Sequence, residues 1–240
     1  MRDSVIKSNH GVTKITTTDL GKARRWYLDA CGTALAMDLV GERWTLLIAR
    51  ELLLGPRRFG EIRGALEGLS ANILTQRLEG MEKAGILRRR TLPSPTNAQV
   101  YELTKWGRAL EEPIFALSRW AAGSPAHDVT LPLSNGAFML SLRTMMDGEA
   151  DPDFTPDLGF RIGGEPFRAQ IVNGMLEIER RDPEGAQVIF AGEPTNLAAT
   201  FYGRDPLIES MREGRVTVTG DIVLGQRFVD LFALPVFSND

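Results

Sequence analysis

The sequence predicts a mainly α-helical domain followed by an α+β domain with one mixed or antiparallel sheet. Apolar residues recur at helical spacing through residues 22–123, whereas several stretches of residues 134–240 alternate with period two. Residues 124–133 contain two prolines and lack either pattern, which predicts a linker. The charge also changes sign, from a net +5 in residues 22–123 to a net −9 in residues 124–240. Two domains with different surfaces are therefore expected.

Composition narrows the class of protein. The chain has 240 residues, 43% of them hydrophobic, which is ample for buried cores. Residues 1–21 are polar and without periodicity, so we interpret them as a mobile N-terminal extension. No apolar stretch is long enough to cross a membrane or to act as a signal core, and Cys31 is the single cysteine. We expect a cytoplasmic protein with no membrane partner.

Signatures of catalysis are missing from the sequence. His10 and His127 stand far apart, and no Cys or His cluster has metal-ligand spacing. No phosphate-binding glycine loop and no nucleophile elbow is found. The sequence therefore predicts no cofactor, no metal, no catalytic residue and no enzymatic activity.

Three helices are expected at the start of the first domain. The first covers residues 33–40 and stops near Gly41. The second ends at Gly55-Pro56, a strong helix stop. The third follows from Phe59, with apolar residues at helical spacing, and closes near Gly68.

The fourth helix, within residues 69–86, has one apolar and one polar stripe. Leu74 and its neighbours Leu78 and Met81 share the apolar stripe, and Ser70 is a plausible N-cap. The opposite stripe carries Asn72, Thr75 and Gln76. Amides and hydroxyls are an unusual choice for a solvated face, so this stripe either faces solvent or contacts a partner.

A basic hairpin and a last helical region complete the domain. Residues 87–91 and 100–103 are expected strands around a loop with two prolines. Residues 105–123 are helical, with Pro113 expected to kink or restart the helix. This region has more large apolar residues than a small domain needs for its own core, which indicates a partner subunit.

The order helix, helix, short turn, helix and hairpin is the winged helix-turn-helix plan, and the helix within residues 69–86 is the third helix of this motif. In it, the third helix of the motif enters the major groove of double-stranded DNA, and the wing and flanking cations meet phosphates. Asn72 and Gln76 could pair with adenine, and Thr75 could contact a thymine methyl or a phosphate. The residues expected at DNA are Arg57, Arg58, Ser70, Asn72, Thr75, Gln76, Arg77, Arg88, Arg89, Arg90, Thr96 and Asn97.

Residues 25–122 resemble the HxlR-type transcriptional regulators, a winged-helix group near the MarR regulators. The resemblance rests on a cysteine spaced before Gly-x-x-Trp (Cys31, with Gly41 to Trp44), on Arg-Phe-x-x-Ile, on Ser-x-x-x-Leu-Thr-x-Arg-Leu and on Tyr-x-Leu-Thr-x-x-Gly. It implies a homodimer on an inverted-repeat operator, with the first and last helices of the domain at the dimer surface. The residues expected there are Leu35, Trp106, Leu110, Ile114, Leu117 and Trp120.

The chain departs from the family at two places. The wing segment "TNAQVY" lacks the arginine that the family often carries, and Ala71 and Asn72 stand where a basic residue is common. In several members the cysteine at the position of Cys31 responds to oxidants, and a site before a helix start favours thiolate. The alternative is an inert cysteine packed at the dimer edge.

The second domain begins with a helix containing Phe138, Met139, Leu142 and Met145 and continues into alternating strands. Asn173-Gly174 predicts a hairpin turn. A further strand, two short helices, another strand and a last apolar helix follow. This order, with "GGEPFRAQIVNGMLEI" and "GRVTVTGD", resembles the sterol-carrier-protein-like fold.

That resemblance implies a tunnel for an apolar small molecule, expected at Phe138, Met139, Leu142, Met145, Phe201 and Phe232. The same residues would equally fill a packed core. The sequence thus favours a DNA-binding regulator whose second domain senses an apolar molecule or supports assembly. The rival hypothesis is a lipid-carrier or small-molecule-binding protein whose first half is a protein-interaction module.

Overall fold

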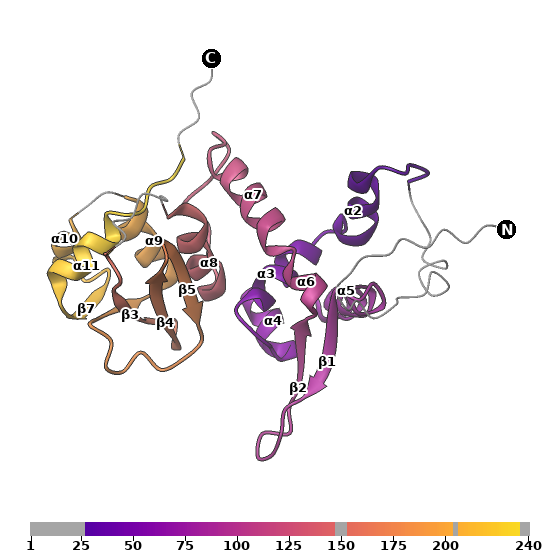
Figure 1. Cartoon of the computed structure of the whole chain (residues 1–240), viewed down its shortest axis with the longest axis horizontal. Coiled ribbons are helices and arrows are strands. Elements are labelled where there is room, and N and C mark those ends of the chain that lie inside the picture. The colour runs from indigo at the N-terminus through magenta and orange to yellow at the C-terminus, as the bar shows by residue number, and fades with distance from the viewer. Residues whose placement is uncertain (1–26, 147–152, 204–205, 236–240) are drawn as a thin grey trace.

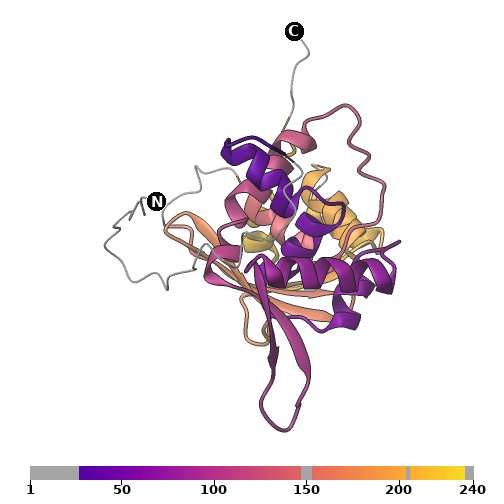
Figure 2. The same ribbon diagram turned by 90° about the vertical axis from the view of Figure 1, so that its right-hand side faces the viewer.

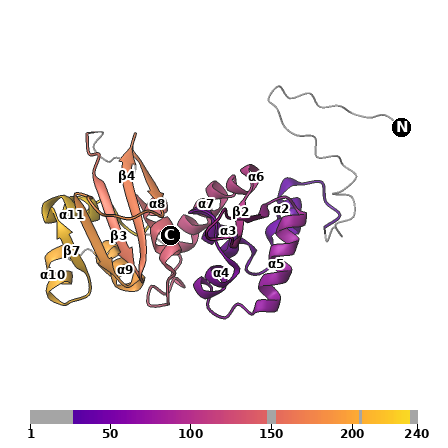
Figure 3. The ribbon, with the colours of Figure 1, turned by 90° about the horizontal axis from the view of Figure 1, so that it is seen from below.

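The structure is a computed structural model that describes residues 27–146, 153–203 and 206–235 (Figure 1). The expected N-terminal extension lies outside the described residues. Two domains lie side by side, and the helices α7 and α8, which follow one another in the chain, lie where the domains meet (Figure 3).

The N-terminal domain has the predicted order of helices and hairpin. Its elements are α2 (Gly32–Val40), α3 (Thr45–Leu53), α4 (Phe59–Ala65), α5 (Ala71–Lys83), β1 (Leu87–Thr91), β2 (Gln99–Leu103), α6 (Lys105–Arg108) and α7 (Glu111–Ala122). Ile48, Leu52, Ile62 and Leu74 are fully buried at its centre. The antiparallel hairpin β1–β2 projects away from the body of the molecule (Figure 2). Helix α5 and the hairpin are therefore set beside each other, as the winged-helix plan requires.

The helical region after the hairpin restarts near Pro113. Helix α6 ends at Arg108 and α7 begins at Glu111, so Pro113 lies in the first turn of α7. The first-turn N–H groups of a helix have no intrahelical partner, which makes proline tolerable there. Of the two expected outcomes, a kink or a restart, the structure has the restart.

The C-terminal domain combines helices with one five-stranded mixed sheet. Its elements are α8 (Asn135–Met145), β3 (Asp157–Ile162), β4 (Glu165–Val172), β5 (Met175–Glu179), β6 (Val188–Gly192), α9 (Pro194–Tyr202), α10 (Leu207–Arg212), β7 (Thr217–Gly220) and α11 (Ile222–Val229). The strand order is β5-β4-β3-β6-β7, and only the β3–β6 pair is parallel. Asn173 and Gly174 both have positive φ in the predicted turn between β4 and β5.

Aromatic rings fill the space between this sheet and its helices. Phe201 of α9 lies 5.6 Å from Phe138 of α8, 5.3 Å from Phe190 of β6 and 5.8 Å from Phe228 of α11, measured between ring centroids. Phe160 of β3 stacks on Phe190 at 5.3 Å. Helices α8, α9 and α11 therefore share one core on one face of the sheet. Among the residues that the structure describes, no helix has both the length and the apolar character needed to cross a membrane.

Candidate nucleic-acid interface

Helix α5 presents the polar stripe that the sequence predicts. Leu74, Leu78 and Met81 are buried, and Asn72 and Gln76 are exposed on the opposite side. A 3.6-residue repeat places these two amides one turn apart, facing the same way. The stripe is therefore free to meet a partner of the helix.

Hydroxyl groups of this helix are partly occupied by its own backbone. Ser70 is the N-cap, and its Oγ accepts a hydrogen bond from the N–H of Ile73 at 3.3 Å. The exposed Thr75 donates its hydroxyl to the carbonyl of Ala71 at 2.9 Å. Ser70 thus starts the helix, and Thr75 leaves chiefly its methyl group and an oxygen lone pair for an outside contact.

The side chain of Arg77 bonds to other residues of its own domain. Its Nη2 lies 2.7 Å from Glu42 Oε2, and its Nε donates to the carbonyl of Arg43 at 3.1 Å. These bonds join α5 to the turn between α2 and α3. A phosphate contact by Arg77, as the sequence predicts, would have to compete with these hydrogen bonds to Glu42 and Arg43.

The three arginines of β1 lie on both faces of the hairpin. Arg88 and Arg90 flank the buried Glu102 of β2, with Nε to carboxylate distances of 2.6 and 3.1 Å. Arg89 faces the other way and bonds Glu82 of α5 at 2.8 Å. All three guanidinium-bearing side chains stay between 43% and 67% exposed, so they can still reach solvent.

Both acidic partners hold their charge. Burial raises the pKa of Glu102, but the hydrogen bonds and charges of Arg88 and Arg90 outweigh it, and the net pKa is lowered. The pKa of Glu82 is also lowered, chiefly by the hydrogen bond from Arg89. Sequence reasoning missed these two carboxylates, although the paired register of β1 and β2 sets Glu102 directly opposite Arg88.

The tip of the hairpin is exposed. Thr96 and Asn97 lie in the loop between β1 and β2, and Asn97 has a positive φ of 43°. The loop closes through a bond from the N–H of Leu92 to the carbonyl of Ala98 at 2.9 Å. Thr96 and Asn97 therefore extend beyond the body of the domain, as expected for a wing.

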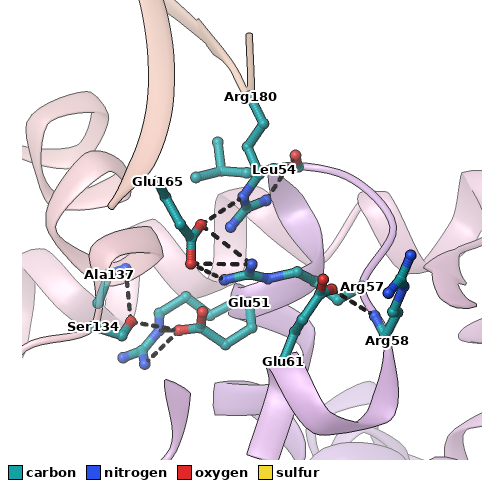
Figure 4. A network of polar contacts seen from close by, with 10 residues as sticks. Glu51, Leu54, Arg57, Arg58, Glu61, Ser134, Ala137, Glu165 and Arg180 are labelled. Carbon is teal, nitrogen blue, oxygen red and sulfur yellow. Dashed lines mark hydrogen bonds and ion pairs between the residues drawn. The ribbon is translucent and has the colours of Figure 1, made fainter. Parts of the chain in front are cut away.

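Arg57 and Arg58 are neighbours with different surroundings. Arg58 is exposed, and its backbone N–H donates to Glu61 at 2.8 Å at the start of α4. Arg57 is only 6% exposed, and two of its guanidinium nitrogens donate hydrogen bonds to Glu165 of the C-terminal domain (Figure 4). This is a correction to the expectation for Arg57, because a buried guanidinium paired in this way is not available to phosphate in this conformation.

The expected dimer residues divide by exposure. Leu35 of α2, Trp106 of α6, and Leu117 and Trp120 of α7 are exposed, with Trp120 at 73%. Ile114 is only 6% exposed and Leu110 is partly buried, because both pack into the core of their own domain. Ile114 is therefore corrected from a dimer contact to a core residue.

Cys31 lies at the exposed N-cap position of α2. Its pKa is lowered from the ordinary value, chiefly by the backbone N–H of Thr33, then by the hydroxyl of Thr33 and the N–H of Ala34. These donors stabilise the thiolate. In the single chain the thiol is accessible, and the choice between a reactive cysteine and one packed at a dimer edge stays a prediction.

The residues expected to line an apolar tunnel lie together in the core of the C-terminal domain. Phe138, Met139, Leu142, Phe201 and Phe232 are buried, and Phe201 and Phe232 are 5.5 Å apart between ring centroids. Met145 is partly buried at the end of α8. Their ring contacts are those of a filled core, and the tunnel stays a prediction.

Comparison with known proteins bears on the N-terminal domain. A family described as HxlR-like helix-turn-helix matches residues 39–127. The uncharacterised HTH-type transcriptional regulator YvaP of Bacillus subtilis is 38% identical over 86 residues, which are 36% of this chain and 80% of YvaP. Rv3095 of Mycobacterium tuberculosis, with the same description, is 39% identical over 118 residues, 49% of this chain and 70% of Rv3095.

Among solved structures, the reduced form of the regulator YodB from B. subtilis is 32% identical and covers 42% of this chain and 100% of its own, with a TM-score of 0.37. The family match ends at residue 127. The resemblance of the C-terminal domain to sterol-carrier proteins therefore stays a prediction.

Proposed function

The chain belongs to the HxlR-like helix-turn-helix family of transcriptional regulators, and on this premise we propose that it binds an inverted-repeat operator as a homodimer. Helix α5 reads bases through Asn72, Thr75 and Gln76, and the hairpin arginines hold phosphates. The observation that carries the proposal is the exposed amide stripe of α5 beside the exposed arginines of β1. Amides that pair with bases supply specificity, whereas cations on phosphates supply affinity and salt dependence.

The test is fluorescence anisotropy at physiological salt, with DNA from upstream of the protein's own gene against a scrambled duplex. Specific recognition predicts a preference of about a thousandfold or more. Gln76→Ala should reduce that preference by about 1–3 kcal/mol, because it removes a base contact. Gln170→Ala, an exposed glutamine on β4, is the matched control and should change nothing.

Arg89→Ala should weaken binding to both duplexes alike and lower the slope of log affinity against log salt by about 0.9. The control is Arg161→Ala, which removes an arginine of the C-terminal domain that is similarly paired with an acid, Asp182. If Gln76→Ala and Arg89→Ala acted alike on both duplexes, the assignment of α5 to the major groove would be wrong.

The homodimer rests on exposed apolar side chains. Trp106, Leu117 and Trp120 on α6 and α7, together with Leu35 on α2, would cost free energy if they stayed in water. An interface made by these helices would cover them. It would also set two copies of α5 on successive turns of one face of the operator.

A response to oxidants is a second proposal, favoured by the exposure of Cys31. The chain has one cysteine, so a disulfide within the protein can form only between two chains. Diamide should then change DNA affinity in the wild type and not in Cys31→Ser. An unchanged affinity in the wild type would remove the proposal.

We infer that the C-terminal domain supports the DNA-binding domain and does not carry an apolar ligand. The ring contacts around Phe201 support this choice between the two alternatives. Native mass spectrometry of the purified protein should find no co-purified apolar molecule, and fatty acids or sterols should give no thermal shift. A bound lipid would restore the sensor hypothesis.

A further inference from the structure

Three charged side chains meet where the two domains touch. Arg57 comes from the loop before α4, Glu165 begins β4, and Arg180 follows β5 (Figure 4). Arg57 Nη1 and Nη2 lie 3.2 and 3.1 Å from Glu165 Oε1, and Arg180 Nε lies 3.2 Å from Glu165 Oε2. One carboxylate thus holds two largely buried guanidinium groups, one from each domain.

Arg57 is also bonded to the wing through its backbone. Its N–H donates to the carbonyl of Tyr101 at 3.0 Å, and the N–H of Tyr101 donates back at 2.8 Å. Tyr101 of β2 pairs directly with Arg89 of β1. Arg57 therefore forms an isolated β-bridge to the hairpin, while its side chain is fixed by the C-terminal domain.

The segment before Arg57 is held from the same side. Arg180 Nη1 donates to the carbonyl of Leu54, just after α3, at 2.9 Å. Within α3 itself, the fully buried Glu51 accepts a hydrogen bond from the hydroxyl of Ser134, the N-cap of α8, at 2.7 Å. The loop from α3 to α4 is thus bonded to the C-terminal domain at more than one point.

This contact is polar and incompletely satisfied. Among the described residues, Glu51 Oε2 and Arg180 Nη2 are buried with no hydrogen-bond partner. Unpaired buried polar atoms oppose burial, so such a contact fixes geometry while adding less stability than apolar packing.

We propose that Glu165 is a positioning residue for the DNA interface: by holding Arg57, it sets the position of the β1–β2 hairpin and lets the C-terminal domain control operator affinity. The physical route is one side-chain ion pair followed by one backbone-paired residue. The consequence for affinity rests on the proposed function, whereas the consequence for the hairpin does not.

The test compares Glu165→Gln with Glu177→Gln in the full chain. Glu177 is an exposed carboxylate on the neighbouring strand β5, so both variants remove one negative charge from the same sheet. Charge alone predicts slightly tighter DNA binding for both, because less negative protein repels phosphate less. The positioning role predicts the opposite for Glu165→Gln, a loss of about three- to tenfold in affinity for a duplex selected by the wild type.

Hydrogen exchange of the free protein gives a second readout. In Glu165→Gln the amides of residues 87–103 should exchange faster, whereas in Glu177→Gln they should match the wild type. Thermal unfolding of both variants checks that each remains folded. Glu165→Asp keeps the charge and should recover part of the lost affinity.

Equal hairpin exchange in the two variants would overturn the inference, as would equal or tighter DNA binding by Glu165→Gln. If the wild type showed no preference for any duplex, the proposed function would fail, and hydrogen exchange alone would still decide the role of Glu165. Faster exchange with weaker binding, in Glu165→Gln only, supports it.

Discussion

The two domains use their large side chains in opposite ways. In the C-terminal domain, phenylalanines from the sheet and helices contact one another in a buried core. In the N-terminal domain, tryptophans stay in water on α6 and α7, and amides stay exposed on α5. Side chains packed within the chain stabilise it, whereas contiguous exposed apolar surface marks interaction sites. This contrast is the basis for proposing that the C-terminal domain supports the N-terminal domain and that the N-terminal domain binds the partners.

The largest expected effect is the loss of the aromatic core. Phe201→Ala should lower the free energy of unfolding of the C-terminal domain by about 3–5 kcal/mol, because it removes a ring that contacts five other phenylalanines and leaves a cavity. Chemical denaturation followed by circular dichroism measures it. Tyr202→Phe, next along α9, removes only a hydroxyl bonded to Ser141 at 2.7 Å and should cost about 1 kcal/mol.

The same pair of variants discriminates between the two interpretations of this domain. If the ring lined an open tunnel, Phe201→Ala would only enlarge an existing space, and its cost would fall well below about 3 kcal/mol. That result would replace the packed support by a ligand-binding domain. It would also remove the contrast between the two domains.

The next effect concerns the exposed apolar face of the N-terminal domain. Trp120→Ala should weaken dimerisation by at least about 2 kcal/mol, or roughly thirtyfold in Kd, because tryptophans at interfaces are frequent hot spots. Analytical ultracentrifugation over a concentration series measures this. Met175→Ala changes another well-exposed apolar residue, on β5, and should leave the oligomeric state unchanged. A monomeric wild type would contradict the proposed dimer outright.

How far the sequence predicted this molecule depended on the range of the interaction. The stripe of α5, the Ser70 cap and the Asn173-Gly174 turn follow from neighbours a few residues apart, and the structure confirms them. The parallel pairing of β3 with β6 joins strands separated by a hairpin, which local patterns do not specify. Helical periodicity placed Ile114 on an apolar face without showing that its own domain covers it.

Among the residues expected at DNA, the wrong prediction was the one for Arg57, whose partner is the most distant in the sequence. Arg57 stands beside Arg58 in a basic segment, so the sequence assigned both to phosphate. Its partner Glu165 lies 108 residues away, and only the contact between the domains brings the two together. Glu82 and Glu102 were missed for a milder form of the same reason, since the ion pair of Glu82 depends on how the hairpin lies on α5 and those of Glu102 on the register of β1 and β2.

The smallest expected effect is a shift in the reactivity of Cys31. It tests whether this exposed residue of the N-terminal domain also forms a thiolate more readily than an ordinary cysteine. The backbone N–H and hydroxyl of Thr33 and the N–H of Ala34 lower the pKa of the thiol below its ordinary value. A thiol with a lowered pKa becomes thiolate at lower pH, and the thiolate is the form that iodoacetamide alkylates. The alkylation rate of the native protein should therefore reach half its plateau at a lower pH than that of the protein unfolded in urea.

Thr33→Val removes the hydroxyl donor but keeps the backbone donors, so it should move the pH profile of alkylation only part of the way back. Coincident profiles for native and unfolded protein would show an ordinary exposed cysteine, and the oxidant response would lose its chemical basis while the DNA interface kept its own.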